Sequence, residues 1–433
     1  MCRDVPKSQT FAGKQVVNSV KQESDRMTAA DNRKKVLQIK APRTVNTENG
    51  VSLCADIVIG GRTETVWFEV NCKYAPFLTD DRLDAFVAAC LYRAMMMGAD
   101  IECEAPVSRR LLYQLNNYLL PVLADNIPEF HRIHVVADPA DLVFSERNAV
   151  ATGWTGGADS MYTFMQMSGD GASDIKLTHL LIANNGALES DNNEELLRSM
   201  VANTENGIAR ETGLSVIGVN SNLDRVFSDE TYLAVAGFRL PAAVLALQKM
   251  FSVFFNSAGY EFSRFSFVPN NSAYYEMFIM PNLSTENTVF YSSGGAASRI
   301  RKLKELSEYP PAHRYLHPCI YTSETNCGMC GKCVRTEAAL YALGTLDRFG
   351  EVFDLNAFEK NKDRILAEII SKRKSQHYGE AYTLLRKEGL LTGRAEQIAA
   401  SMNAAKTVVS RNRERIEELL SSVRESDSLT RKL

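Results

Sequence analysis

The spacing of apolar positions predicts mixed strands and helices in the first third of the chain. Two runs of strand length, VSLCADIVIG and ETVWFEV, flank a Gly60-Gly61 turn, and DRLDAFVAACLYRAMMMGA has helical periodicity and ends at a glycine. A strand at DIECEA, a helix from Ser108 to about Ala124 and a strand at RIHVVAD follow. We therefore expect residues 41–145 to form an N-terminal α+β domain.

From Asn148 onward, apolar runs of strand length alternate with segments of helical period. NAVATGW, LTHLLIANN and LSVIGVNSN are predicted strands, and helices are predicted at SMYTFMQM and over about residues 193–212. A long helix over 232–256 and a strand at SRFSFVP continue the pattern. This alternation predicts an α/β fold with a doubly wound parallel sheet, assigned to residues 146–350.

The last part of the chain, residues 351–433, is predicted to be a helical C-terminal region. Within it, a 4-3 spacing is kept by eight positions: Ile398, Met402, Ala405, Val409, Asn412, Ile416, Leu419 and Val423. We call these eight positions the seam, and their spacing has two interpretations. The helix packs on its own domain, or residues 398–423 bind a second copy of the chain or a partner helix.

Residues 1–40 have a different composition, with nine basic and four acidic side chains and a single aromatic residue, Phe11. A segment this poor in large apolar side chains cannot build a core, so a disordered arm is predicted. A basic arm could contact nucleic acid, but a solvated tail is the favoured interpretation.

Composition narrows the class of protein further. The 49 Lys and Arg residues nearly balance 52 Asp and Glu residues, so the net charge of −3 gives no support to general nucleic-acid or membrane affinity. The most apolar stretch, 232–255, contains Arg239, Pro241 and Lys249 and so indicates a buried helix, not a membrane span. Nine cysteines, four of them within residues 319–333, favour a reducing compartment and a metal site, and we expect a cytoplasmic protein.

The stretch GWTGGADSMYT, residues 153–163, follows a predicted strand and opens a predicted helix. Gly156 and Gly157 allow backbone N–H groups to converge, and the helix directs its positive end at the same point. Thr155 and Ser160 add hydroxyl donors. Asp159 would repel an anion unless a divalent cation such as Mg²⁺ bridges it to phosphate oxygens. The pattern therefore predicts a phosphate and Mg²⁺ site.

The segment TGGADS resembles the S-G-G-x-D-S loop of the ATP pyrophosphatase (PP-loop) superfamily, which has the adenine nucleotide alpha hydrolase-like fold. The resemblance implies that ATP is cleaved between its α and β phosphates and that AMP is transferred to an oxygen of the substrate. It also implies that Thr155, Gly156 and Gly157, with the catalytic Asp159 and Ser160, hold pyrophosphate and Mg²⁺. Thr155 stands where serine is usual and keeps the hydroxyl group.

The stretch HPCIYTSETNCGMCGKCVRT has the cysteine spacing C-x7-C-x2-C-x2-C, formed by Cys319, Cys327, Cys330 and Cys333. Two overlapping C-x2-C units and one more distant cysteine suit a tetrahedral thiolate site, for which structural Zn²⁺ is the usual occupant. An iron–sulfur cluster is the alternative, because four cysteines also suit one.

The loop and the cysteines together, over about residues 148–345, resemble the 7-cyano-7-deazaguanine synthase family. That resemblance implies an ATP-dependent C–N ligase or synthase that adenylates a carboxylate or carbonyl oxygen of a small-molecule acid, followed by attack of ammonia or an amine. The expected products are AMP and pyrophosphate. The extra N-terminal domain and helical tail depart from a plain synthase, which leaves the acceptor and queuosine precursor synthesis open.

Two further residues are candidates for nucleotide contacts. Asn185, in IANNG at the end of a predicted strand, is expected near the adenosine. Arg299 follows a second small-residue loop in YSSGGAASRIRKL and is expected to contact the phosphates, with Arg301 and Lys302 nearby in the sequence. The competing interpretation of this second stretch is a glycine turn into a solvated basic helix.

Two alternative functions remain. An RNA-modifying enzyme of the tRNA thiolation type would need a catalytic cysteine pair outside the metal site and a basic surface, and the net charge of −3 disfavours a nucleic-acid partner. A non-catalytic nucleotide-binding interaction protein would bind ATP without turnover and would work through its helical tail.

Overall fold

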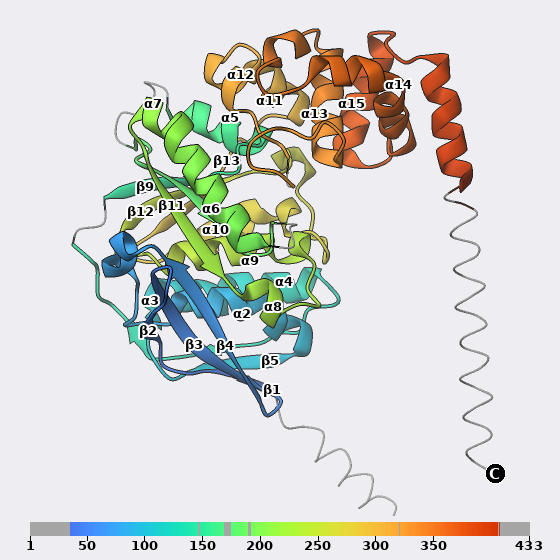
Figure 1. Cartoon of the computed structure of the whole chain (residues 1–433). Helices are drawn as coiled ribbons and strands as arrows, with labels where there is room; N and C mark the ends of the chain where they lie inside the picture. The colour runs from blue at the N-terminus through green and yellow to red at the C-terminus, as the bar shows by residue number, and fades with distance from the viewer. Residues whose placement is uncertain are drawn as a thin grey trace, which may run out of the picture.

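The computed structural model describes residues 35–407, apart from 146–147, 169–174, 189–191, 320 and 406. The strands of its main sheet are β1 (Lys35–Ile39), β2 (Arg43–Asn46), β3 (Val51–Ile59), β4 (Arg62–Val70), β5 (Ala99–Cys103), β7 (Val135–Val136), β9 (Ala149–Gly153), β10 (His179–Ala183), β11 (Ser215–Ser221), β12 (Phe251–Ser257) and β13 (Val289–Ser293). They lie in the order β13-β12-β9-β10-β11-β4-β3-β1-β5-β7, with β2 paired to β3 (Figure 1). The short strands β6 (Val107–Ser108) and β8 (Pro139–Ala140) pair separately.

The α-helices cover this sheet and extend beyond it. They are α2 (Asp84–Met97), α3 (Arg109–Gln114), α4 (Leu120–Asn126), α5 (Ala158–Met167), α6 (Asn193–Thr204), α7 (Arg210–Thr212), α8 (Leu223–Val226), α9 (Tyr232–Leu245), α10 (Glu276–Asn282), α11 (Arg299–Leu306), α12 (Pro310–Tyr315), α13 (Gly331–Ala342), α14 (Leu355–Ser371) and α15 (Gln376–Lys387). The last five of these helices gather at one end of the molecule, and β1–β5 lie at the other (Figure 1).

The N-terminal elements follow the predicted pattern, with one correction. The hairpin of β3 and β4 turns at Gly60 and Gly61, both at positive φ, and α2 ends at Gly98 in the left-handed conformation. The arm predicted over residues 1–40 is wrong at its end, because Lys35–Ile39 forms β1 between β3 and β5. This strand buries Leu37 and Ile39, so alternating apolar residues outweighed the basic composition. Residues 1–34 lie outside the described residues.

Strands β9 to β13 form a parallel sheet with the order β13-β12-β9-β10-β11. The chain moves outward from β9 through β10 to β11 and then returns to the other side of β9 for β12 and β13. This order is compatible with the predicted doubly wound α/β fold. The point where the direction reverses, between β9 and β12, is where such sheets leave a crevice at the carboxyl ends of their strands.

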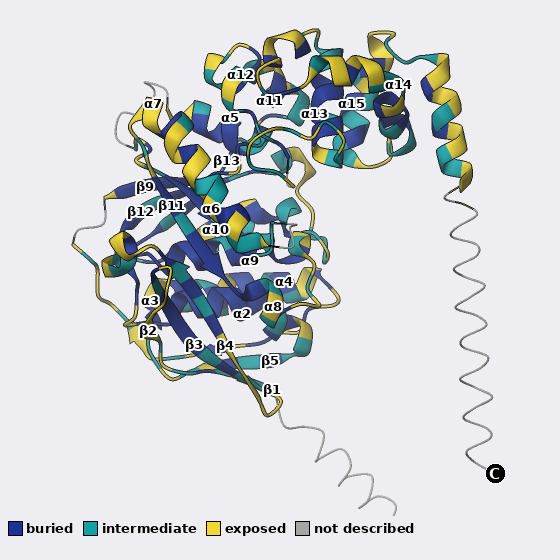
Figure 2. Cartoon of the chain, viewed as in Figure 1, coloured by how far each residue is buried: buried dark blue, intermediate teal, exposed yellow. Residues whose placement is uncertain are grey.

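Alternate residues of these strands face two separate cores, because side chains in a strand point to opposite sides. On β10, Leu181 belongs to the core shared with α2 and α9, whereas Leu180 and Ile182 belong to the core shared with α5 and the C-terminal helices. Figure 2 shows the buried strands between these layers. Both faces of the sheet are therefore covered, as near-continuous apolar strands require.

Two predicted elements of this part are wrong. The helix expected over 232–256 ends at Leu245, and Phe251–Ser257 forms β12 instead of SRFSFVP. SRFSFVP, residues 263–269, begins within the short 3₁₀ turn Phe262–Arg264 and forms no strand. A short, mostly apolar run such as FSVFF does not reveal by its periodicity whether it is a strand or a buried helix.

The N-terminal elements and the parallel strands share one sheet, joined by the antiparallel pair of β4 and β11. Helices α2 and α9 also contact each other, and a charged network lies beside them. Glu230 accepts hydrogen bonds from Arg93 of α2 at 3.0 Å and from Arg239 of α9 at 3.0 Å, and the side chains of Glu230 and Arg239 are 4% and 2% exposed. This buried carboxylate therefore links the two halves of the sheet.

The C-terminal region is helical in its described part, as predicted, and it packs on the second core. Phe358, Leu366 and Leu385 are buried there. Residues 393–405 are also helical, and Ile398 and Met402 pack against the same core. Ile398 and Met402 of the seam therefore face their own domain, Ala405 is exposed, and the positions from Val409 onward lie outside the described residues. In the part of the chain that the structure describes, no helix has both the length and the apolarity needed to cross a membrane.

Glu230→Ala should lower the free energy of unfolding by about 3–5 kcal/mol, because it leaves Arg239 buried without its carboxylate partner. Asp229→Ala is the matched control. Asp229 also pairs with Arg93, but its side chain is 73% exposed, so a loss below about 1 kcal/mol is expected. Urea unfolding followed by circular dichroism measures both variants. Equal losses would contradict a special role for the buried pair.

Candidate functional site

The glycine-rich loop joins β9 to α5 at the point where the sheet order reverses. Trp154 N–H donates to the Leu181 carbonyl at 2.7 Å, which ties the start of the loop to β10. Gly156 then adopts φ +69°, a conformation that favours glycine, and Gly157 caps α5. The predicted order of strand, bend and helix is therefore present.

The amides at the start of α5 point out of the helix without internal partners. No acceptor is found within the described residues for the N–H groups of Ala158, Asp159 and Ser160, as the geometry of a first helical turn requires. The hydroxyls of Thr155 and Ser160 lie 3.3 Å apart, and Ser160 Oγ donates to the Gly157 carbonyl at 3.0 Å. The hydroxyls thus shape the loop, and the helix directs unpaired donors and its positive end at one point.

The segment before the first cysteine fastens this loop. His317 N–H donates to the Gly156 carbonyl at 2.7 Å, and a Cβ added at Gly156 would lie 2.9 Å from the His317 Cβ. His317 Nε2 pairs with the Thr322 carbonyl at 2.7 Å. His317 therefore holds the loop by its main chain and is not one of the clustered metal-ligand candidates.

Asp159 faces two cations of α11. Its carboxylate contacts the Arg299 guanidinium and accepts from Lys302 Nζ at 2.9 Å, and Lys302 Nζ also donates to the Ala258 carbonyl at 2.6 Å. Burial alone would raise the pKa of Asp159, but Arg299 and Lys302 outweigh burial and lower the pKa to about 2. Arg299 and Lys302 share one face of α11, whereas Arg301 pairs with Glu305 in solvent. Helical spacing thus separates the predicted basic residues into two groups.

More positive charge comes from α13, the helix that begins inside the cysteine motif. Burial and the nearby Arg299 lower the pKa of Arg335 to about 10, so Arg335 is still a cation at neutral pH. The described residues provide no ion-pair partner for Arg335 or for Lys332 one turn before it, and Arg335 Nε and Arg299 Nε are buried without hydrogen-bond partners. We call Arg299, Lys302, Lys332 and Arg335 the cation cluster. Asp159 is the carboxylate that pairs with it.

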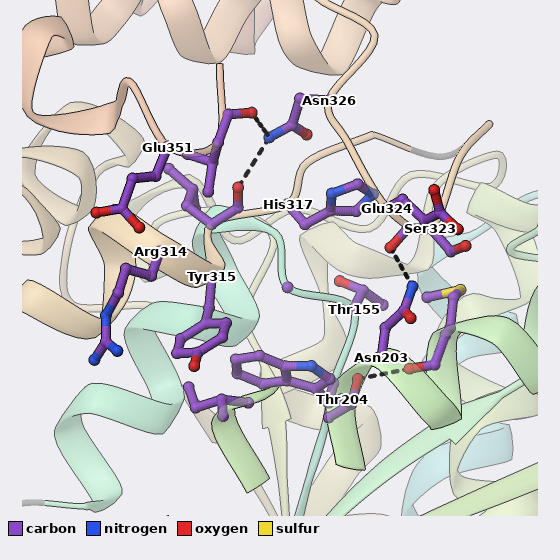
Figure 3. A pocket seen from close by; sticks show the side chains of 16 residues that line it. Thr155, Asn203, Thr204, Arg314, Tyr315, His317, Ser323, Glu324, Asn326 and Glu351 are labelled. Carbon is purple, nitrogen blue, oxygen red and sulfur yellow. Dashed lines mark hydrogen bonds between the residues drawn. The ribbon is translucent and has the colours of Figure 1, made fainter. Parts of the chain in front are cut away.

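A cavity of about 400 Å³ opens on the other side of the loop (Figure 3). Thr155 and Gly156 form one wall, Asn203 and Thr204 of α6 form another, and much of the rest comes from α12 and the segment that follows it. Its size is within the range of small-molecule sites. The loop therefore borders a ligand-sized cavity through Thr155 and Gly156, and the cation cluster through Asp159.

The four predicted cysteines come together, and their sulfur atoms all lie within 4.8 Å of one another. A tetrahedron of about 2.3 Å Zn–S bonds has edges of about 3.8 Å, so a small contraction would bring the sulfurs into contact with one ion. Cys330 N–H and Cys333 N–H point at the sulfurs of Cys327 and Cys330, at 3.3 and 3.4 Å, and Gly328 adopts φ +68° in the turn between. The cluster could bind a metal ion such as Zn²⁺.

Asn185 does not join these groups. It lies at the end of β10 with 2% exposure, its carbonyl accepts from Arg239 Nη1 at 3.3 Å, and it does not line the cavity. Its side-chain oxygen has no hydrogen-bond partner in the described part of the chain. Its expected contact with adenosine stays a prediction.

Sequence reasoning missed three residues of the site. Lys332 and Arg335 lie in the cysteine motif itself, CGKCVRT, and their three-residue spacing is a signal for one helix face. His377 belongs to α15, which packs against the two helices that carry the cations, although it lies far from Asp159 along the chain. No local pattern marks His377, because only tertiary packing brings α15 to the loop.

The comparisons with known proteins leave the family open. No protein-family model matches the chain, and neither the curated proteins nor the solved structures contain a significant match. The loop, the cation cluster, the cavity and the cysteines are therefore the features that bear on function.

Asp159→Asn should change the pH dependence of stability. Because the folded pKa of about 2 lies below the usual value of 3.8, the ionised carboxylate stabilises the fold above about pH 4, and this contribution is lost as the pH falls toward 2. The variant should lose about 2 kcal/mol of unfolding free energy at pH 6 and progressively less at pH 4 and pH 3. Asp141→Asn, which removes an exposed partner of Arg109, should change little. A difference from wild type that does not vary with pH would contradict the assignment.

Cys333→Ser should abolish stoichiometric metal binding, because three thiolates no longer complete a tetrahedral site. Plasma mass spectrometry of purified protein should find about one zinc per wild-type chain and well below that in the variant. Cys72→Ser, at an exposed cysteine outside the cluster, should retain the metal. Iron with visible absorbance in the wild type would instead favour the iron–sulfur interpretation.

Proposed function

We propose that the protein transfers AMP from ATP to a carboxylate or carbonyl oxygen of a small-molecule acid and releases pyrophosphate, after which ammonia or an amine displaces AMP. This is the chemistry of the PP-loop ATP pyrophosphatases, in a form similar to 7-cyano-7-deazaguanine synthase. The observation that carries the proposal is the cation cluster beside the unpaired amides of α5, opposed by a single contacting carboxylate.

Charge balance supports a polyanionic ligand. Two of the four cations, Arg299 and Lys302, share Asp159, and Lys332 and Arg335 have no ion-pair partner in the described chain. Three of these cations, Arg299, Lys302 and Arg335, are half-buried or buried and repel one another, so they favour a ligand of opposite charge. The outer phosphates of a nucleoside triphosphate supply that charge and accept hydrogen bonds from the amides of Ala158 to Ser160.

The shape of the surroundings supports a nucleotide over free phosphate. The cavity beside Thr155 and Gly156 is continuous with the loop and has room for a nucleoside. Outer phosphates at the cation cluster would then place the α phosphate over the loop itself. In this position, the acceptor oxygen would attack the α phosphorus, and the bond from the α phosphorus to the oxygen shared with the β phosphate would break.

The residues at the loop would assist by stabilising the departing pyrophosphate. Hydrogen-bond donors are already in place before the reaction, from the amides of α5 and from the side chains of Arg299 and Lys302. Donors fixed in this way stabilise negative charge as it develops on the pyrophosphate. Mg²⁺, when bound with the nucleotide, supplies further positive charge at these oxygens, and Asp159 is the loop carboxylate that would hold it. Arg299 and Lys302 would then pair with phosphate in place of Asp159. Zn²⁺ at the four cysteines would serve the fold, since it would anchor the start of α13.

The alternative functions have weaker support. The described cysteines outside the cluster, Cys54, Cys72, Cys90 and Cys103, belong to β3, the 3₁₀ turn Cys72–Phe77, α2 and β5. Cys54 and Cys90 are buried, so neither offers an accessible thiol to an RNA base. A non-catalytic nucleotide-binding protein would share the cation cluster and differ in forming no AMP.

Incubation of the protein with ATP, Mg²⁺ and ammonia and a panel of carboxylic acids should yield AMP and pyrophosphate for at least one acid. Asp159→Asn should abolish this turnover. Arg299→Ala should lower kcat/KM for ATP by about 10- to 100-fold, because a charge-assisted hydrogen bond to phosphate is lost.

Arg301→Ala is the matched control, since Arg301 lies on the same helix with a 64% exposed side chain and pairs with Glu305. It should retain wild-type turnover. ADP as the sole nucleotide product would rule out the proposed reaction, and ATP binding without any product would favour the interaction protein.

A further inference from the structure

His377 lies on α15, the helix that packs against both α11 and α13, which carry the cation cluster. The His377 ring lies parallel to the Tyr260 ring, with centroids 4.8 Å apart and an angle of 4° between the planes. Tyr260 in turn stacks on Tyr274 at 4.2 Å, and Tyr274 OH donates to Oε1 of Gln376 at 2.8 Å. The imidazole is therefore held in one orientation by a stack of rings and by the residue before it.

His377 carries no charge at neutral pH. Burial lowers its pKa first, and the neighbouring Arg299 and Arg335 lower it further, to about 2, although Asp159 acts in the opposite direction. Lys302 adds to the same repulsion. Three of the four cations of the cluster, together with Asp159, thus act on His377.

Nδ1 of His377 is buried and has no hydrogen-bond partner within the described residues. A ring that served only as packing would leave this polar atom unsatisfied at a cost in free energy. A neutral imidazole can present Nδ1–H as a donor without adding a fifth positive charge to the cation cluster. An incoming anion would supply the missing acceptor.

Helix α15 is built into the site at two further points. Glu380 accepts from the Ile300 N–H at the start of α11, at 3.4 Å. Tyr378 OH donates to the Gly331 carbonyl at the start of α13, at 3.2 Å. These are the two helices that carry the cation cluster, so the position of His377 is coupled to the positions of the cations.

We infer that His377 is a binding residue for the outer phosphates, and that its Nδ1–H donates a hydrogen bond to a pyrophosphate oxygen. The C-terminal helices then complete the phosphate site. This inference rests on the proposed function, because it requires that pyrophosphate or the outer phosphates of ATP occupy the cation cluster.

The test measures binding of inorganic pyrophosphate and of AMP, with Mg²⁺, to the full-length protein by titration calorimetry. His377→Phe keeps a ring on Tyr260 and removes the donor, so it should weaken pyrophosphate binding about 10-fold or more and leave AMP binding unchanged. His377→Asn places an amide donor close to the position of Nδ1 and should stay within about 3-fold of wild type.

His313→Phe is the control. His313 is another half-buried histidine, which contacts Phe349 edge to face away from the loop, and its replacement should leave both affinities unchanged. The melting temperatures of all variants report whether they fold. If His377→Phe does not fold, the pyrophosphate affinity of His377→Asn tests the role of His377.

Three results would overturn the inference. They are unchanged pyrophosphate binding in His377→Phe, equal weakening of pyrophosphate and AMP, and an Asn variant that binds as weakly as the Phe variant. If the wild type binds AMP or ATP and only the His377 role fails, the proposed function stands. If the wild type does not bind pyrophosphate at all, the phosphate site and the role of His377 fall together.

Discussion

Repulsion within the cation cluster is the constraint on which the site depends. Arg299, Lys302, Lys332 and Arg335 come from two helices and converge beside the positive end of a third, and Asp159 offsets only part of their charge. Such an arrangement persists only where the surrounding structure holds the helices in place. The protein does so with two devices, the cysteine cluster at the start of α13 and the contacts of α15 with α11 and α13.

The sheet explains why these helices meet at the loop. In a doubly wound order, the loop after β9 lies where neighbouring strands lead to opposite sides, so helices from both directions can approach its amides. The N-terminal strands extend the same sheet through β4 and β11 on the edge away from β12. They enlarge the core without blocking the carboxyl ends of the central strands. They therefore contribute to the sheet that supports the loop and not to the loop itself.

Much of this architecture was predictable from local patterns. The strand, glycine bend and helix at residues 149–167 and the spacing of Cys319, Cys327, Cys330 and Cys333 each have a local physical cause, and the structure shows both. Predictions failed where the pattern was ambiguous. FSVFF is mostly apolar and too short to show a period, and the short strand β1 follows a basic segment whose composition suggested an arm.

The sequence by itself therefore determined the features that depend on neighbours along the chain. These are the periodicity of the elements, the turn at Gly156 and Gly157, and the clustering of thiols within fifteen residues. The tertiary structure decided which distant side chains share the loop. Lys302 was visible only as one of several basic residues, and His377 carried no local signal. The physical reason is that charge density and buried, unpaired donors arise from helices packed through space, which no periodicity along the chain records.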